Sequence, residues 1–576
     1  MSHTRPTCAQ LALHGLSALI VLWTISAGSY MAMFNVPPGV KLAIVDLNIS
    51  LASLFIPLFL ALKPLARRFL FFLACLLTVT LVAADEPQSN NNQGNDNQSN
   101  DKWLEPARSR LMHVTGGMPF FPHRANTTGN LVLNVKDFDN AQVCGACHTE
   151  IYKQWRSSMM SQAWDEPIYR ALLKRASAAT EGKVDNFCTG CHTPIGLTTG
   201  QITSQVNRSS VEDSAKNTPM PGVDCETCHN ISARTGLDNG AYVLSPRANG
   251  KPTKFGPRKD AVSPYHDTVY SALHTRSDFC GTCHNVTHPF SSVAVERTYD
   301  EWQESTYSLN DITCQSCHMP GFKGKAAIMG PDREEVASHW FSGANAMMLN
   351  HLGQEEGAQR ARNMLARAGE ITFEQLPAAI VAGQYTSVAV KVSNVGAGHK
   401  LPTGFPEGRE MWIDFRVLDA TGREIYRLGS IKDGKTEINT RNFKVHIGDK
   451  DGNPLDVEVW NATQILSDNR ILPKGYDIGE FSFLVPADAV GPLTLTADLN
   501  YWPFSQKLAD YLLGKDKVQV EITRMANVTQ SVPLSTSLPV VGADTGAVST
   551  PGLAPVMPGD NQKATEKNRF VTFRLR

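Results

Sequence analysis

The sequence lacks a large net charge of either sign, and few of its cysteines lie outside one repeated motif. Its 54 lysines and arginines nearly balance 55 aspartates and glutamates, which leaves a formal charge of −1 over 576 residues. This balance gives no electrostatic case for binding nucleic acid or an anionic surface. Of the 12 cysteines, all but Cys8 and Cys75 lie in one repeated motif, so beyond residue 85 no cysteine is left for disulfides outside it.

The repeated motif is Cys-x-x-Cys-His, the attachment signal of a c-type haem. Two thiols three residues apart lie on one helical turn and can form thioethers with the two vinyl groups of one porphyrin. The histidine that follows becomes the proximal ligand of the iron. Five copies predict five haem c groups, bound by Cys144, Cys147 and His148; Cys188, Cys191 and His192; Cys225, Cys228 and His229; Cys280, Cys283 and His284; and Cys314, Cys317 and His318.

Zinc binding is the main alternative for a Cys-x-x-Cys pair. Structural zinc usually joins two such pairs, and five pairs leave one without a partner. Zinc also gives no reason for a histidine to follow the second cysteine every time. The motif therefore favours haem over zinc or disulfide chemistry.

The first 84 residues contain three apolar runs, Leu11–Phe34, Leu42–Leu62 and Phe69–Ala84. The first two are long enough to span a bilayer at about 20 residues each. The third follows Arg67-Arg68 and ends in small residues, as a secretory signal peptide does. Two interpretations of this segment remain open. It is either a three-span membrane anchor, or a signal peptide preceded by an extension that need not be translated.

Charge placement agrees with either interpretation. Arg5, Lys63, Arg67 and Arg68 would stay in the cytoplasm, which sends residue 85 onward across the membrane. Haem c is attached on that far side, so we expect a periplasmic or extracellular protein. Residues 14–62 faintly resemble part of a bacterial cytochrome b-561 membrane domain, but these runs contain only His14 and carry over no haem b site.

The expected fold class is an α+β multidomain protein. A mainly helical or irregular pentahaem domain, packed by its own haems, would follow the N-terminal transmembrane or signal helices and precede an antiparallel β-sandwich. The expected boundaries are 1–84 for the membrane and signal segments, 85–101 for a disordered linker, 102–369 for the pentahaem domain, 370–531 for the β-sandwich, and 532–576 for a low-complexity tail.

About 175 residues from Cys144 to His318 leave roughly 35 per haem, too few to build an ordinary core around each. We expect a short helix at each motif and longer helices over Glu150–Ala176 and Glu355–Ala368. Past Glu370 apolar residues alternate with polar ones between turn signals, which predicts short antiparallel strands. These alternating runs lie around Val388–Val392, Ile413–Val417, Phe481–Val485, Leu493–Leu495 and Val518–Val520, with a helix near Ser505–Leu513 and a last strand at Phe570–Phe573.

The haem region resembles the multihaem family related to cytochrome c-554, the tetrahaem electron carrier of nitrifying bacteria. The resemblance covers about residues 130–525 and rests on segments 144–167, 271–284, 338–345 and 396–404. The last of these, Gly396-Ala-Gly-His399-Lys-Leu-Pro-Thr-Gly404, is typical of members with an appended C-terminal β domain. The family commonly supplies a histidine, often distant in sequence, as the sixth ligand.

By resemblance we expect His274, His339 and His399 to be distal ligands. Where the family usually has a distal histidine after the first motif, this sequence has Met160. A methionine sulfur would raise that haem's potential relative to bis-His ligation; a Met160 that only packs against the porphyrin would leave the iron open. The fifth distal ligand is unassigned among His123, His266 and His288.

Electron transfer is the leading interpretation, with redox donor and acceptor proteins as partners and the membrane as a further one if the N-terminal helices stay uncleaved. The main alternative is an oxidoreductase that acts on a small nitrogen or sulfur species at an open haem. No Cys-x-x-Cys-Lys variant is present, and Tyr265, Tyr270 and Arg276 are the nearest acid–base candidates. A third interpretation is a subunit of a haem-conducting filament.

Overall fold

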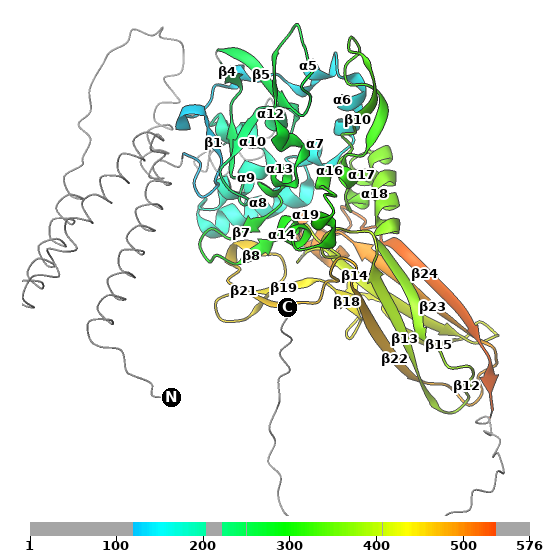
Figure 1. The fold of residues 1–576 in the computed structure, drawn as a ribbon. Coiled ribbons are helices and arrows are strands. Elements are labelled where there is room, and N and C mark those ends of the chain that lie inside the picture. Colours follow the sequence, from blue (N-terminus) through cyan, green and yellow to red (C-terminus); the bar gives the residue numbers. More distant parts are fainter. Residues whose placement is uncertain (1–118, 203–221, 249, 406, 537–576) are drawn as a thin grey trace, which may run out of the picture. The chain divides into compact units, whose positions relative to one another are not determined.

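The computed structural model describes residues 119–202, 222–248, 250–405 and 407–536 (Figure 1). The three apolar runs, the expected linker, most of the C-terminal tail and its expected strand at Phe570–Phe573 lie outside these residues. Within them, no helix combines the length and the apolar character needed to cross a membrane.

Each Cys-x-x-Cys-His motif forms or ends a short helix, as the sequence predicts. The His148 and His284 amides, which follow their helices, still donate to the carbonyls of Cys144 and Cys280 at 2.9 Å, so the helical turn runs through the motif. The five helices are α5 (Ala141–Gly145), α9 (Asp185–His192), α12 (Cys225–His229), α13 (Ser277–Gly281) and α16 (Cys314–His318).

The expected single helix over Glu150–Ala176 is wrong. The chain forms α6 (Thr149–Arg156), α7 (Met159–Gln162) and α8 (Pro167–Thr180) instead. Ser158 caps α7 by accepting from the Ser161 amide, and Pro167 occupies the first turn of α8, where its missing N–H costs no bond. The expected helix over Glu355–Ala368 is confirmed as α18.

The remaining helices of this region are short and connect the motifs. They are α10 (Pro194–Thr198), α14 (Thr298–Gln303), α15 (Thr306–Leu309) and α17 (Ala346–His351), with 3-10 turns η1 (Thr128–Asn130), η2 (Val135–Asp137) and η3 (Ala272–Thr275).

Small sheets before, between and after the motifs were not expected from the sequence. The strands are β1 (Asn126–Thr127), β2 (Ile231–Arg234), β3 (Tyr242–Leu244), β4 (Arg247–Ala248), β5 (Lys251–Gly256), β6 (Asp267–Tyr270), β7 (Val286–Thr287), β8 (Ala294–Glu296), β9 (Gly321–Lys325) and β10 (Asp332–Ala337). They pair in sheets of two or three strands, too short to show a period of two in the sequence.

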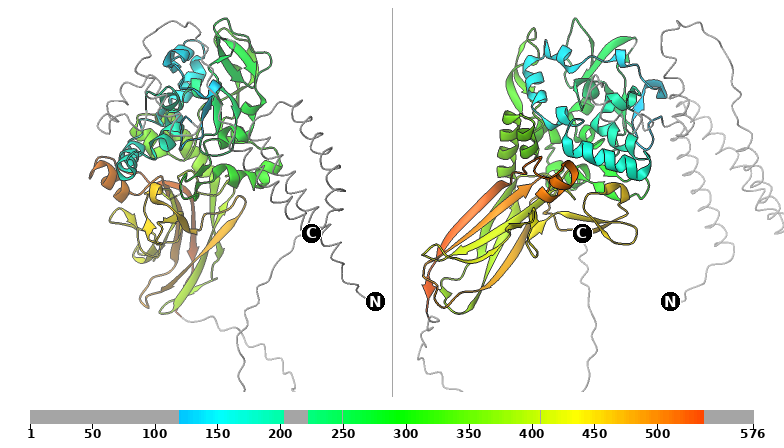
Figure 2. Two further views of the ribbon diagram at one scale, coloured as in Figure 1. Left: turned by 90° about the vertical axis from the view of Figure 1, so that its left-hand side faces the viewer. Right: turned by 180° about the vertical axis from the view of Figure 1, so that it is seen from behind.

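From Gly369 the chain is dominated by antiparallel sheets, seen from two further sides in Figure 2. One has the order β11-β13-β22; a second has β15-β14-β23-β24, with β18 beside β14. Their strands are β11 (Gly369–Gln375), β13 (Tyr385–Asn394), β14 (Glu410–Leu418), β15 (Glu424–Leu428), β18 (Asn442–Phe443), β22 (Tyr476–Leu484), β23 (Leu493–Trp502) and β24 (Thr523–Val532).

Shorter elements complete this region. They are β12 (Ile380–Val381), β16 (Ile431–Lys432), β17 (Lys435–Thr436), β19 (Val445–Gly448), β20 (Pro454–Leu455), β21 (Gln464–Asp468), β25 (Leu534–Ser535), η4 (Val459–Asn461) and α19 (Gln506–Leu513). The helix α19 confirms the one expected near Ser505–Leu513, and Ser505 caps it.

Both large sheets bury their apolar faces in one hydrophobic core. Val388, Val390 and Val392 of β13 are buried at every second position, as the alternation predicts. Phe415 of β14 meets Phe481 of β22 across this core, with ring centroids 4.7 Å apart. Such aromatic pairs stabilise packing by about 1 kcal/mol beyond the area that they bury.

The strand expected at Val518–Val520 is wrong. Both valines are buried, but in a separate cluster with Trp502 and with Ile168 of α8. Their alternation reflects packing between α8 and the sheet region rather than strand pairing.

Candidate haem-binding site

Three of the five motif helices, α5, α12 and α16, are fixed at their N-termini by side-chain caps. Asp224, directly before the third motif, accepts from the Thr227 amide at 2.8 Å and from its hydroxyl at 2.9 Å. Thr313 and Ser316 form a reciprocal capping box at the fifth motif. These caps satisfy amides that a helix of one turn cannot bond internally, and they hold the two thiols on one face.

Four of the five motif histidines bond to a backbone carbonyl through Nδ1. Each bond leaves Nε2 free, and a neutral imidazole held in this way presents Nε2 to a metal. This donor set fits haem c, with two thiols and one oriented imidazole per motif. The bonds join His148 to Ala326 (2.7 Å), His192 to Ala163 (2.8 Å), His229 to Phe255 (2.7 Å) and His318 to Ser342 (2.6 Å).

The fourth motif differs, because the Nδ1 atom of His284 faces a carboxylate. Glu296 Oε1 lies 3.5 Å from it. The strands β7 and β8 form a hairpin directly after the motif and pair Val286 with Glu296, which returns the carboxylate to His284. Burial lowers the pKa of His284, but Glu296 outweighs it and raises the pKa to about 9.

Two of the expected distal histidines face motif histidines. The ring of His399 lies 6.4 Å from that of His318 with planes 16° apart, and His339 lies 6.5 Å from His229 at 26°. Two imidazoles that bind one metal between them through bonds of about 2 Å have ring centres about 6 Å apart. Nδ1 of His399 and of His339 also contacts a carbonyl, that of Lys400 (2.9 Å) and Ala337 (3.0 Å), which leaves Nε2 available.

The third expected distal histidine, His274, lies beside the third motif in a different way. Its ring is 5.8 Å from that of His229, and its Nε2 contacts the Cys228 carbonyl at 3.0 Å. Its Nδ1 is buried, with no hydrogen-bond partner among the described residues. His274 and His339 therefore both approach His229, and one iron has a single distal position.

Met160 lies on α7, and the backbone of this helix and of its C-cap contacts two motif regions. The Met160 carbonyl accepts from the Val223 amide at 2.9 Å, just before the third motif. The Ala163 carbonyl, at the end of the same helix, takes the Nδ1 bond of His192. The Met160 side chain is partly exposed, and its place as a ligand stays a prediction.

The three remaining candidates are held differently. His288 accepts from the Ser291 amide at Nδ1 and contacts the Trp460 carbonyl at Nε2, so both nitrogens are engaged. His123 is 1% exposed and accepts from the Ala125 amide at Nδ1, which places its proton on Nε2. His266 contacts the Asp267 carbonyl at 3.2 Å through Nδ1 and keeps Nε2 available.

Thiols of different motifs lie against one another. Cys144 of the first motif contacts Cys225 of the third, Cys191 of the second contacts Cys283 of the fourth, and Cys280 of the fourth contacts Cys314 of the fifth. Cys228 of the third motif also interacts electrostatically with Cys280 and Cys283. The fourth motif therefore adjoins the second and the fifth and lies near the third.

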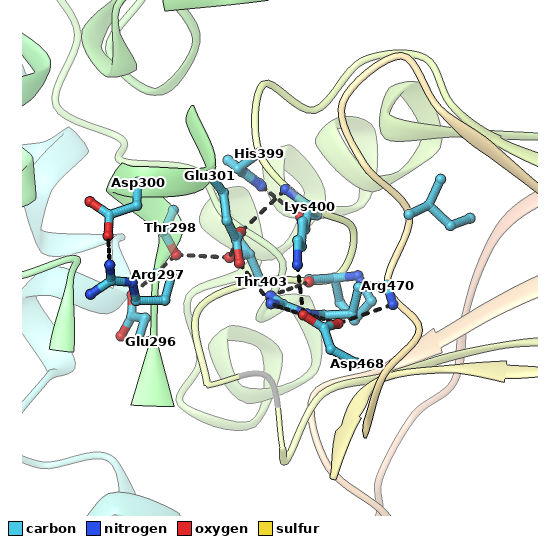
Figure 3. A network of polar contacts seen from close by, with 12 residues as sticks. Glu296, Arg297, Thr298, Asp300, Glu301, His399, Lys400, Thr403, Asp468 and Arg470 are labelled. Atoms are coloured by element: carbon cyan, nitrogen blue, oxygen red, sulfur yellow. Dashed lines mark hydrogen bonds and ion pairs between the residues drawn. The ribbon is translucent and has the colours of Figure 1, made fainter. Parts of the chain in front are cut away.

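A buried polar network joins the haem region to the loop that carries His399 (Figure 3). Glu301 of α14 pairs with Arg470 at 2.7 Å, and both side chains are about 5% exposed. Glu301 also accepts from the Lys400 amide at 3.2 Å and from the Thr403 hydroxyl at 2.8 Å. The carboxylate of Glu301 thus holds Lys400 and Thr403, which lie one and four residues after His399.

Sequence reasoning did not identify Glu296, Glu301 or Arg470. Each lies at least twelve residues from the histidine that it faces or supports, so no local spacing marks it. The one signal at hand was the polar segment Glu296–Glu301, which begins twelve residues after the fourth motif.

Comparison with known proteins supports the haem interpretation for part of the chain. Residues 143–230 match the family of cytochrome c554 and c-prime. This segment contains the first three motifs and relates the chain to the multihaem c-type cytochromes, with haem c as cofactor. No curated protein matches the sequence.

Solved structures give weaker likenesses. A penta-heme cytochrome c552 from Thermochromatium tepidum is 19% identical with a TM-score of 0.49, and the match covers 69% of this chain and 99% of that one. The CARDB domain of the PF1109 protein from Pyrococcus furiosus is 11% identical with a TM-score of 0.14, and the match covers 29% of this chain and 86% of that one.

Proposed function

We propose that the protein is an electron-transfer cytochrome that carries five haem c groups, one on each Cys-x-x-Cys-His motif. The observation that carries this proposal is the common arrangement of the motifs. Each places two thiols and one imidazole on a single helical turn, with Nδ1 facing a carbonyl or carboxylate oxygen. When bound, haem supplies the one-electron chemistry, and the chain supplies ligands, burial and spacing.

Electron transfer is favoured because the motifs adjoin one another. The thiol contacts join the first motif to the third, and the fourth motif to the second and the fifth. Haems attached to touching cysteines have short edge-to-edge separations, which suits the passage of electrons between them. Redox donor and acceptor proteins are then the partners at the ends of the array.

We place the cytochrome on the outer side of the cytoplasmic membrane, tethered there if residues 1–84 are not cleaved. The support is the sequence pattern of apolar runs and inner positive charges, together with haem attachment outside the cytoplasm. A phosphatase fused after residue 101 should be active in cells, and an inactive fusion would contradict this location.

The haem count tests the proposal directly. Denatured mature protein should carry five covalently bound haems by intact-mass analysis. Replacing both cysteines of the fifth motif (Cys314→Ala with Cys317→Ala) should remove exactly one haem mass from that total. A fully matured protein with fewer than five haems would contradict the proposal.

An oxidoreductase that uses an open haem remains the second candidate, and the histidine placement favours keeping it. Ring pairs with a second, non-motif histidine are found for His229 and His318. His192 instead stacks on Tyr169, with ring centroids 3.6 Å apart. EPR of the oxidised protein distinguishes the two functions: only low-spin iron supports the carrier, and a stable high-spin centre supports the enzyme.

A further inference from the structure

We infer that Glu296 is a positioning residue that lowers the reduction potential of the haem on the fourth motif, through a carboxylate that lies beside Nδ1 of the proximal ligand, His284. The inference rests on the proposed function, because it requires a haem at this motif. It goes beyond that function by making one of the five haems electronically distinct through a named side chain.

The contrast among the motifs carries the inference. At the other four motifs, the Nδ1 partner is a neutral backbone carbonyl at 2.6–2.8 Å. At the fourth, the Glu296 carboxylate lies 3.5 Å from Nδ1. A carboxylate partner makes a ligating imidazole more basic than a carbonyl partner does.

The charge of Glu296 is not neutralised by a basic side chain. In the described ranges, no lysine or arginine lies within 4 Å of its carboxylate; its neighbour Arg297 pairs with Asp300 instead. Glu296 Oε1 accepts from the Thr298 hydroxyl at 3.2 Å, and its side chain is 20% exposed. A partly buried negative charge is screened less than one at the surface.

A second carboxyl in this neighbourhood does not compete with Glu296. Glu407 is 2% exposed, and its oxygens have no hydrogen-bond partner among the described residues. Burial above all, with a contribution from Glu296, raises the pKa of Glu407 to about 8. The carboxylate that lies next to Nδ1 of His284 is that of Glu296.

The direction of the effect follows from charge. Reduction adds one electron to the ferric haem and lowers its positive charge by one. A fixed carboxylate and a more basic imidazole both stabilise the more positive ferric state. The potential of the fourth haem is therefore lower than it would be with a neutral Nδ1 partner.

The rest of the structure can hold the carboxylate in this place. Glu296 ends β8, whose pairing with β7 fixes the backbone. The hydroxyl of Thr298 contacts both Glu296 and the hydroxyl of Thr403, at 2.8 Å from the latter. The orientation of Glu296 is thus tied to the loop that carries His399 (Figure 3).

The test is a redox titration of the full-length holoprotein with dithionite and ferricyanide, followed by optical spectra and EPR. Glu296→Gln keeps the size and an acceptor oxygen but removes the charge. It should move one of five one-electron components to higher potential and leave the other four in place. Glu480→Gln, on the exposed face of β22, is the matched control and should move none.

Glu296→Asp provides the second variant. It keeps the charge but withdraws it from Nδ1 by one methylene, so the same component should move upward by less than in Glu296→Gln. If Glu296→Gln fails to mature, the upward shift in Glu296→Asp alone carries the test.

Unchanged potentials in the matured variants, with five haems present by mass, overturn the inference about Glu296 only. Four haems on the unsubstituted protein, with the fourth motif bare, overturn the proposed function instead.

Discussion

The five motif histidines have the same sequence context and differ in what their Nδ1 atoms contact. The motif alone predicts which histidine is the proximal ligand, because its two thiols and its imidazole lie on one helical turn. It does not predict the Nδ1 partner, which comes from 29 residues away for His192 and from 178 residues away for His148. The tuning of each haem is thus decided by tertiary contacts.

His399 is the distal candidate with the clearest geometry, since its ring lies 6.4 Å from that of His318 and the two ring planes are 16° apart. We predict that His399→Ala keeps all five haems by mass but converts one low-spin iron to high-spin, because the sixth ligand of the fifth haem is lost. The matched control is His446→Ala, an exposed histidine of β19. An unchanged EPR spectrum would reduce His399 to a packing role.

Substitution of Met160 tests whether a methionine sulfur replaces the distal histidine that the family usually has at this position. If its sulfur binds iron, Met160→His should lower one reduction potential and remove the weak red absorption of a His/Met haem, because imidazole favours ferric iron more than thioether does. If Met160 only packs at an open iron, the same change should remove a high-spin EPR signal. Its neighbour Met159, which packs into two apolar clusters, supplies the control Met159→Leu. No change in spectrum or potential would place Met160 away from every iron.

At the level of elements, the sequence predicted what has a local period or a local cap. The helix α18, the helix α19 after Ser505, and the alternation of β13 and β14 follow from spacing alone. The break of the expected long helix into α6, α7 and α8 depends on Ser158, which caps α7, and on Pro167 in the first turn of α8; the prediction gave more weight to apolar periodicity. The strands near the motifs have only two to six residues, too few to show a period of two in the sequence.

The loop 396–403 owes its position to α14 and to Arg470. Asn394 binds the His399 carbonyl at 2.9 Å from one side, and Glu301 holds Lys400 and Thr403 from the other. Neither partner is predictable from the local pattern Gly396-Ala-Gly-His399, which indicated a close approach of the backbone to the haem and no more.

We predict that Glu301→Ala destabilises this connection, because it removes one of the two carboxylates that pair with the buried guanidinium of Arg470. Breaking a buried ion pair costs about 3–5 kcal/mol, and Arg470 retains Asp468 at 2.9 Å, so we expect a loss of about 3 kcal/mol in the free energy of unfolding. Thermal unfolding followed by circular dichroism measures it, together with partial loss of the low-spin signal of the fifth haem.

The control for this change is an ion pair of the same type at the surface. Lys323 and Glu334 lie 2.9 Å apart with side chains 73% and 87% exposed. Glu334→Ala should cost less than about 1 kcal/mol, because solvent screens exposed pairs. Equal effects of Glu301→Ala and Glu334→Ala would show that the buried network does not hold the loop.

Over the whole molecule, the thiol contacts give the motifs an order that differs from their order in the sequence. The first motif adjoins the third, the third lies near the fourth, and the fourth adjoins both the second and the fifth. The sequence fixes only the number of motifs and their spacing along the chain. Their neighbours in space depend on the strands and loops between them, which return distant cysteines to one place.

The fourth haem should therefore be the junction of the array. We predict that removing it, by Cys280→Ala with Cys283→Ala, separates the second haem from the fifth. After a pulse that supplies less than one electron per molecule, the intact protein should reach its equilibrium distribution of electrons in one fast phase, because every haem adjoins another. The variant should add a slow phase, since electrons on the second haem have lost their nearest neighbour.

Removing the fifth haem instead (Cys314→Ala with Cys317→Ala) also deletes one haem but leaves the other four connected, so its kinetics should stay fast. Both variants should carry four haems by mass. A fourth-motif variant as fast as the fifth-motif variant would contradict the central place of the fourth haem, and with it the order deduced from the thiol contacts.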